Sequence, residues 1–233
     1  ANDNFTGGTE TDNGIERTID KDWNVTGEKA GTDFIASLTV VSDTDLAALP
    51  VSFKASSGDT LISTKSFDWG GSESTYYTDA GAVLGYTFSY NEGSSTGITY
   101  EDADRNWLGN KHEDTATGWS SSVTVATNDD GSRVETGSDR QYKVVDGSAT
   151  TEAEWSRDFE YNFDANGNFT GGTETDNGIE RSYDANWNVT AEAASSAFIA
   201  GLSTVSQADL DGLPASFAAS SGDTRAVAGS ARA

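Results

Sequence analysis

The order of apolar and polar residues changes along the chain, and this change divides it into segments with different expected structures. Between residues 61 and 164, aromatic or β-branched residues alternate with Thr, Ser or Glu. This is the period-2 pattern of strands with one wet face. Turn signals rich in Gly, Asn and Asp separate the runs at spacings of roughly 8–12 residues, as in an antiparallel meander. The expected strands cover residues 75–79, 83–90, 96–102, 121–127, 132–137, 140–145 and 154–163, with turns at 91–95, 128–132, 136–139 and 145–148.

A second pattern, with helical spacing, follows residue 33. Ser42 is suited to cap a helix, with Asp45 at the third helical position as in a capping box. Leu46, Leu49 and Phe53 then recur at helical spacing. Pro50 and Pro214 are the only prolines in the chain, and each is expected to interrupt or end a helix. The pattern predicts one or two short helices here, and again in a later segment that keeps Ser206, Asp209, Leu210, Leu213 and Phe217.

The chain contains an internal repeat. Residues 1–60 align without a gap with residues 165–224, and 41 of the 60 positions are identical. We therefore divide the chain into a repeat copy at 1–60, a β-rich region at 61–164, a second copy at 165–224 and a tail at 225–233. The first copy begins within a motif, which suggests a cut from a longer array with a period near 164 residues. Tandem modules usually extend a protein, provide several binding sites or mediate assembly.

Both copies read as antiparallel hairpins. Asn13-Gly14 and Asn177-Gly178 stand between alternating arms and supply the two positive φ angles of a tight turn. The fold class we predict is therefore mainly β: an antiparallel hairpin or meander sheet, as a sandwich or an extended sheet, with one or two short helices in each repeated segment.

A sequence segment at the start of the second repeat copy resembles a known motif. YNFDANGNFTGG, with RSYDANWNVT twenty residues further on, is similar to the YD hairpin repeat of RHS-type bacterial surface and toxin proteins. Phe163-Asp164 and Tyr183-Asp184 fit the aromatic-Asp pair, whereas Ile19 replaces the aromatic residue before Asp20. The acidic, long-period repetition is also similar to repeat regions of large calcium-dependent bacterial adhesins and matrix proteins, although the GGxGxDxxx array of RTX proteins is absent. Both resemblances imply a protein of the bacterial surface.

Charge and composition narrow the partners. The chain has 38 acidic and 14 basic side chains, a formal charge of −24, and no Cys or Met. Such a surface disfavours nucleic acid and anionic lipid and favours cations. The lack of Cys excludes disulfides and thiolate chemistry. No apolar run approaches the ~20 residues of a membrane span, so we expect no membrane insertion. Glycine-rich and turn-dense composition is common in secreted β proteins, so we expect a secreted protein, extracellular or on the cell surface.

Four segments have the pattern Asp-x-[Asp/Asn]-x-Asn, whose alternating oxygen ligands suit Ca²⁺. The candidate calcium ligands are Asp20, Asp22, Asn24, Asp102, Asp104, Asn106, Glu113, Asp164, Asn166, Asn168, Asp184, Asn186 and Asn188. Glu113 is included because it follows Asp102 at the twelfth position, where an EF-hand places its bidentate ligand, but Trp107 stands where that loop needs Gly. The alternative interpretation is that these Asp and Asn residues only form turns, because their side chains bond to their own backbone.

Other candidate chemistry is sparse. The lone His112 cannot form a His-rich zinc site, and no nucleophile motif frames a serine. We expect no enzyme activity and name no catalytic or cofactor-binding residues. The predicted function is a structural or adhesive module of a secreted, acidic tandem-repeat protein, calcium-stabilised, that assembles a cell surface or biofilm matrix through self-association or neighbouring repeats. The alternatives are a carbohydrate-binding module, whose Trp and Tyr rings would stack on glycans, and a fragment of a polysaccharide-acting enzyme.

Overall fold

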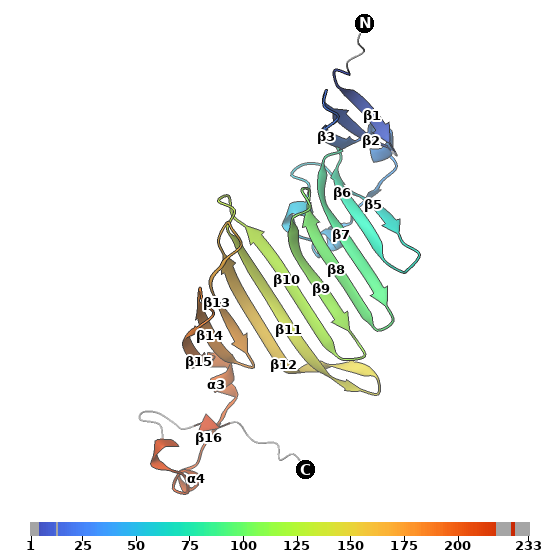
Figure 1. Ribbon diagram of the computed structural model, residues 1–233. Coiled ribbons are helices and arrows are strands. Elements are labelled where there is room, and N and C mark those ends of the chain that lie inside the picture. The colour runs from blue at the N-terminus through green and yellow to red at the C-terminus, as the bar shows by residue number, and fades with distance from the viewer. Residues whose placement is uncertain (1–4, 13, 218–224, 227–233) are drawn as a thin grey trace. The chain divides into compact units, whose positions relative to one another are not determined.

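The structure is a computed structural model that describes residues 5–12, 14–217 and 225–226 of the chain (Figure 1). It confirms the predicted class, because antiparallel strands dominate and the helices are few and short. The chain forms two compact units. The first contains residues 1–126 and 142–152, and the second contains residues 127–141 and 153–233. The hairpin between residues 127 and 163 is therefore divided between the units.

The strands of the first unit follow one another in chain order. The first repeat copy begins with a three-stranded sheet of β1 (Gly8–Asp12), β2 (Ile15–Ile19) and β3 (Val25–Ala30). A second sheet is a meander in which each strand pairs antiparallel with the next along the chain. Its strands in this unit are β4 (Thr39–Val40), β5 (Thr60–Ser66), β6 (Ser72–Thr78), β7 (Val83–Glu92), β8 (Ser95–Asp102), β9 (Trp107–Asp114) and β10 (Trp119–Thr127).

Three short helical segments connect β3 to β5. They are α1 (Thr32–Ile35), α2 (Asp43–Leu46) and the 3-10 helix η1 (Val51–Phe53). The Ser42 hydroxyl accepts a hydrogen bond from the Asp45 backbone N–H at 3.2 Å, which confirms the predicted cap. Pro50 lies directly before η1, so the proline interrupts the helical path as expected.

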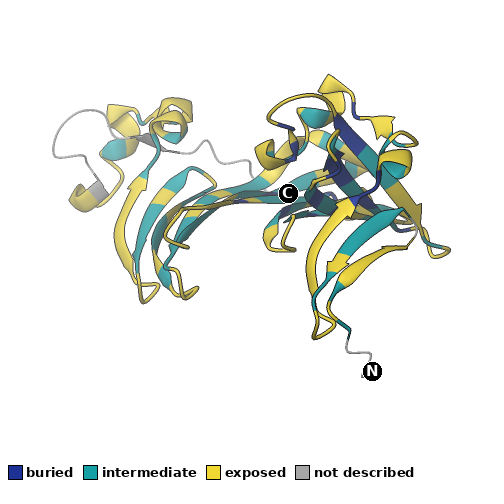
Figure 2. Cartoon of the chain, turned by 90° about the horizontal axis from the view of Figure 1, so that it is seen from above, coloured by how far each residue is buried: buried dark blue, intermediate teal, exposed yellow. Residues whose placement is uncertain are grey.

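The hydrophobic core lies where these helical segments cover the meander sheet. One cluster joins Ala30, Leu61 and Tyr77, and a second joins Val41, Phe53 and Tyr76. Phe53 is completely buried, and its ring lies so close to Gly85 that a Cβ there would meet it at 2.3 Å. All nine buried hydrophobic side chains that the structure describes belong to this unit, as the dark blue positions in Figure 2 illustrate.

The second unit is built on the meander of the second repeat copy. Its strands are parts of β11 (Arg133–Val145) and β12 (Ser148–Phe163), then β13 (Phe169–Asp176), β14 (Ile179–Asp184) and β15 (Val189–Ala194). These are followed by α3 (Ser196–Gly201), β16 (Ser203–Thr204), α4 (Gln207–Leu210), η2 (Ala215–Phe217) and β17 (Arg225–Ala226).

This second unit is held together without fully buried apolar side chains among its described residues. Asp139 is buried, and its carboxylate pairs with the guanidinium of Arg157 on the neighbouring strand, with 2.9 Å between Nε and Oδ2. The unit therefore depends on strand-to-strand hydrogen bonds and partly exposed cross-strand side chains.

Three strand expectations differ from the structure. The turn predicted at 136–139 does not form, because β11 continues through it and Asp139 pairs with Arg157 instead of capping a turn. Strands β5 and β9 were not expected, since their segments are rich in polar and charged residues. The turns expected at 91–95, 128–132 and 145–148 lie between strands, as predicted.

Candidate functional site

The four Asp-x-[Asp/Asn]-x-Asn segments form one and the same hairpin turn. In each, the N–H of the fourth residue donates to the aspartate carbonyl and the aspartate N–H donates to the carbonyl of the fifth residue, at 2.9–3.2 Å. A register shift in the neighbouring strands follows each turn. This is a type I turn closed by a bulge, and it requires a left-handed residue at its fourth position. The left-handed residues are Trp23, Arg105, Gly167 and Trp187.

The aspartate side chain closes the turn from within. In the third copy of the pattern, Asp164 Oδ1 accepts the backbone N–H groups of Asn166 and Asn168, both at 2.9 Å. The Asn168 amide group donates to Asp164 Oδ2 at 2.9 Å. The same contacts recur in the turns that begin at Asp20, Asp102 and Asp184.

These hydrogen bonds favour the ionised carboxylate. The side-chain and backbone N–H groups of Asn168 lower the pKa of Asp164, and those of Asn188 lower the pKa of Asp184. The pKa of Asp20 is lowered chiefly by the backbone N–H of Asn24. Asp20, Asp164 and Asp184 are therefore charged acceptors for their own turns, which agrees with the turn-forming interpretation of these residues.

The predicted calcium ligands do not all come together. Each turn brings together its own Asp, central residue and Asn, but Glu113 lies on β9 opposite Thr96, whereas Trp107 at the start of β9 lies opposite Glu101. Glu113 stands six positions further along the strand than Trp107, about 20 Å at ~3.3 Å per residue. The EF-hand spacing to Asp102 is thus a coincidence of a hairpin, and Glu113 does not join that loop.

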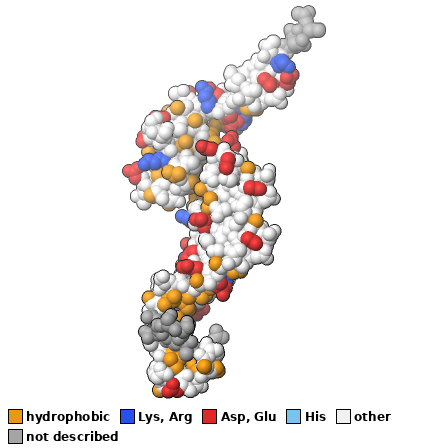
Figure 3. Space-filling model, turned by 90° about the vertical axis from the view of Figure 1, so that its left-hand side faces the viewer, with side chains coloured by type: hydrophobic (Ala, Val, Ile, Leu, Met, Phe, Trp, Pro, Cys, Tyr) orange, Lys and Arg blue, Asp and Glu red, His pale blue; other side chains and the backbone are white. Residues whose placement is uncertain are grey.

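On the face shown in Figure 3, Asp and Glu are scattered in small groups rather than gathered in one patch. Over the described parts of the chain, no three His, Asp or Glu side chains lie close enough together to hold a metal ion. Calcium binding therefore stays a prediction from composition and loop pattern.

The left-handed position of the turn carries a large side chain in three of the four cases, and each covers a ring. Trp187 stacks on Phe169 with 3.7 Å between ring centroids and 9° between planes. Trp23 stacks on Phe5 at 4.1 Å, and the Arg105 guanidinium lies 3.3 Å from the Tyr86 ring centroid. A left-handed conformation costs ~1–2 kcal/mol for a residue with a Cβ. Ring packing offsets this cost.

A network of tyrosines surrounds the Trp187 stack in the second unit. The Tyr161 hydroxyl donates to Glu174 Oε2 at 3.0 Å, and the Tyr183 hydroxyl donates to Oε1 at 2.8 Å. Burial and the hydrogen bond to Glu174 raise the pKa of Tyr161 to about 12. The Tyr161 ring also meets Trp187 edge-on at 5.2 Å. Strand β12 thus provides a tyrosine that covers both the ring stack and the carboxylate of β13.

The first unit carries a compact cluster of three aromatic rings. Phe67 and Trp69 are stacked at 5.5 Å and 7°, and Phe88 lies 5.6 Å from Trp69 and 6.2 Å from Phe67, so the ring centroids form a triangle. Trp69 is 51% exposed and Phe88 41% exposed. The Trp69 ring lies flat over Gly71, where a Cβ would meet it at 1.9 Å. Two of the three rings are therefore exposed, unlike the rings of a buried aromatic core.

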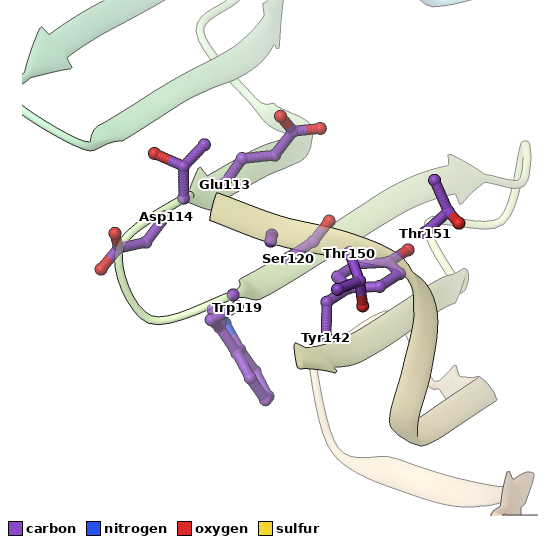
Figure 4. A pocket seen from close by; sticks show the side chains of 10 residues that line it. Glu113, Asp114, Trp119, Ser120, Tyr142, Thr150 and Thr151 are labelled. Atoms are coloured by element: carbon purple, nitrogen blue, oxygen red, sulfur yellow. The ribbon is translucent and has the colours of Figure 1, made fainter. Parts of the chain in front are cut away.

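The remaining candidates have structural partners. His112 Nδ1 and the Tyr90 hydroxyl share a hydrogen bond of 2.6 Å across β7–β9. A hollow of about 370 Å³ in the first unit is lined by Glu113, Asp114 and Trp119, among others. In Figure 4 the carboxylates of Glu113 and Asp114 point in different directions. Asp114 Oδ1 accepts the Ser94 hydroxyl, which lowers the pKa of Asp114, so this group does not have the raised pKa of a general acid.

The residues that the sequence did not reveal are those at the left-handed turn position and the cluster of Phe67, Trp69 and Phe88. Aligning the four turns on their aspartates would have placed Trp23, Arg105 and Trp187 with Gly167, and so predicted their positive φ. Phe88 gave no such signal, because its place beside Trp69 depends on the pairing of β6 with β7.

No described helix has the length and apolar character that crossing a membrane would need. Comparisons with protein-family models, curated proteins and solved structures give no match to this chain.

Proposed function

We propose that this chain is a structural module of a secreted tandem-repeat bacterial protein, located on the cell surface or in the extracellular matrix. The main support for the proposal is that one sequence segment, present in both repeat copies, forms the same hairpin in each. Residues 5–17 and 169–181 have the same sequence, and each copy forms the same hairpin, with Gly8 opposite Ile19 and Gly172 opposite Tyr183. A sequence segment that forms the same hairpin in two units is suited to be the repeating element of a tandem array.

Such a module is stabilised mainly by contacts between residues that are close in the sequence. Each aspartate turn closes with its own backbone and side-chain groups, so a strand pair needs no contact from a distant part of the chain. The first unit adds a hydrophobic core, which supplies a stable anchor. In the hollow beside Trp119 the carboxylates of Glu113 and Asp114 point in different directions, and His112 is hydrogen-bonded to Tyr90, which favours a structural role over catalysis.

Calcium stabilisation is the second part of the proposal, and it rests on charge rather than on a preformed site. A formal charge of −24 repels itself, and bound divalent ions would reduce that repulsion. Melting curves of the chain in calcium and in chelator test this part. A higher midpoint in calcium than in magnesium at equal ionic strength supports specific binding, whereas equal midpoints remove calcium from the proposal and leave the turns as the stabilising elements.

Location tests the structural role itself. An antibody raised against the chain is used on fractions of the source bacterium and on intact cells. Signal in the surface or matrix fraction, accessible on intact cells, is the expected result. Signal confined to the cytosol would overturn the proposal, and an RNA polymerase subunit serves as the control for leakage.

A second candidate function, carbohydrate binding, is favoured by the exposed Trp69 and Phe88 rings of the aromatic cluster. Exposed rings offer apolar faces on which sugars can stack, and the Lys65 ammonium, 5.4 Å from the Phe67 ring centroid, adds a hydrogen-bond donor at the edge. The test is binding to a panel of polysaccharides by calorimetry. We expect Trp69→Ala to abolish any binding and Trp107→Ala, another exposed tryptophan of the unit, to preserve it. Equal loss in both variants would argue against this cluster as the binding surface.

A further inference from the structure

The two copies of the repeated phrase have the same sequence but different neighbours. In the second copy, β13 lies between β14 and β12, and β12 pairs with β13 along the whole length of β13. In the first copy, β1 has β2 on one side and is the edge strand of its sheet among the described residues. The identical strand therefore has its second edge covered in one unit and open in the other.

Side-chain exposure shows how much this neighbour matters. Glu174 is 12% exposed, whereas its counterpart Glu10 is 53% exposed. Asp176 is 33% exposed, and its counterpart Asp12 is 65% exposed. Arg181 and Arg17, which face these acids from the next strand, are exposed to nearly the same extent, 27% and 29%. The difference is therefore concentrated on the strand that β12 would cover.

The open edge presents a defined set of backbone groups. Asp12 and Ile15 close the two-residue turn between β1 and β2, and such a closing pair exchanges both of its hydrogen bonds. The N–H and C=O of Thr11, and those of Thr9, therefore point away from β2. Their counterparts Thr175 and Thr173 lie opposite Asp158 and Glu160 of β12.

The aromatic stack beside this edge also lacks a cover. In the second copy, Tyr161 of β12 meets both Phe169 and Trp187 edge-on, at 5.8 and 5.2 Å. The counterpart stack of Phe5 and Trp23 forms in the first copy, and Trp23 is 69% exposed against 51% for Trp187.

We propose that the outer edge of β1, with the Phe5–Trp23 stack, is an acceptor for a strand with the sequence of β12, supplied by another repeat of the same protein. This inference deepens the proposed structural function and rests on it. The second copy defines the register. Subtracting the repeat offset of 164 places Arg157 of the donor opposite Asp12, Phe159 opposite Glu10, Tyr161 opposite Gly8 and Phe163 opposite Phe5.

The occupant follows from side-chain complementarity as well as from backbone pairing. The donor tyrosine would hydrogen-bond Glu10 as Tyr161 bonds Glu174, and its ring would cover the Phe5–Trp23 stack. The donor arginine would add a positive charge beside Asp12. One difference is that Ile19 replaces Tyr183, so the second hydroxyl to the glutamate is absent in the first copy.

The experiment uses the full chain and a fluorescent peptide with the sequence of residues 154–163. Fluorescence anisotropy is expected to show saturable binding at one peptide per chain. A peptide of the same composition in scrambled order is the control for non-specific attraction. Thr11→Pro removes an outward N–H and is expected to weaken binding about tenfold or more. Thr11→Val keeps that N–H and is expected to bind like the unchanged chain.

A second pair of variants tests the ring stack without touching the backbone of β1. Trp23→Ala is expected to weaken peptide binding about tenfold, because the donor tyrosine loses its ring contact. Trp187→Ala is the matched control, since the same change in the second copy lies beside an edge already covered by β12. Far-UV circular dichroism confirms that each variant is folded.

Three results would overturn the inference: no saturable binding of the peptide, equal binding by the Thr11→Pro and unchanged chains, or equal losses from Trp23→Ala and Trp187→Ala. Self-association of the chain that the peptide does not compete away would assign assembly to a different surface and also count against it. The surface location of the protein is measured separately, so failure here leaves the structural proposal standing on its own test.

Discussion

Trp187 allows a test of the turn mechanism in which strain and packing have opposite signs. Its φ of 62° is left-handed, a conformation that costs ~1–2 kcal/mol for a residue with a Cβ. Trp187→Ala keeps this cost and loses the ring, whereas Trp187→Gly loses the ring but relieves the strain. In an ordinary extended position the order is reversed, because Gly is less favourable than Ala by roughly 0.5–1 kcal/mol.

The magnitude of the packing loss follows from exposure. A fully covered Trp buries ~200 Å², and Trp187 is 51% exposed, so it covers about 100 Å², worth about 2.5 kcal/mol at ~25 cal/mol per Å². The stack on Phe169 adds ~1 kcal/mol. We therefore expect Trp187→Ala to lower the free energy of unfolding by about 3.5 kcal/mol and Trp187→Gly by only about 2.5 kcal/mol, once roughly 1 kcal/mol of strain is relieved.

The assay is urea unfolding followed by far-UV circular dichroism, which does not depend on the tryptophan that is removed. Trp107 provides the matched control, since it begins strand β9 and has no positive φ. There we expect the glycine variant to be less stable than the alanine variant. If Trp187→Gly is no more stable than Trp187→Ala, the left-handed turn is not strained and the account of its fourth position is wrong.

Three further predictions follow from burial and titration. Phe53→Ala, at the completely buried core position, should lower the free energy of unfolding by ~3–5 kcal/mol in urea titrations, and a loss below about 1 kcal/mol would contradict the packing described. Hydrogen bonds lower the pKa values of Asp164 and Asp184 below the ordinary 3.8, so the stabilisation from these carboxylates is full above pH 3.8 and is lost as the pH falls through their folded-state pKa values. The double variant Asp164→Asn, Asp184→Asn should therefore show a flatter dependence of the free energy of unfolding on pH in this acid range. An unchanged slope would count against the turn contacts. The pKa of Tyr161 is raised from 10.0 to about 12, so the stabilisation from its hydroxyl is full below pH 10 and is lost as the pH rises toward 12. The variant Tyr161→Phe should remove one late-titrating tyrosine from the ultraviolet titration curve. An unaltered curve would mean that the hydroxyl does not bond Glu174.

Local patterns in the sequence were sufficient to predict the hairpins and caps. Asn177-Gly178 forms the two-residue turn between β13 and β14 with positive φ at both residues, and Ser206 caps α4 through Asp209 as Ser42 caps α2. These features depend on residues within five positions of one another, so a linear pattern contains the needed information.

Features that depend on pairing between distant segments could not be predicted in the same way. The spacing from Asp102 to Glu113 resembled a calcium loop, but a hairpin turn followed by a strand carries Glu113 away. The Gly-Ser-Asp signal at 137–139 resembled a turn, but Asp139 finds Arg157 on β12. The open edge of β1 became visible only because the structure holds two copies of one phrase in different surroundings.

The near-absence of a buried interior along β12–β15 has a consequence for how such a protein changes in length. Apart from the rings around Trp187, each strand touches little beyond its two immediate neighbours, so the free energy of the sheet increases by similar increments, as in a zipper. A gene duplication that inserts or deletes one hairpin would then alter the span of the protein without requiring a new interior to be packed. Opening would begin at the outermost strand, β15, and amide hydrogen exchange would slow from there toward β12.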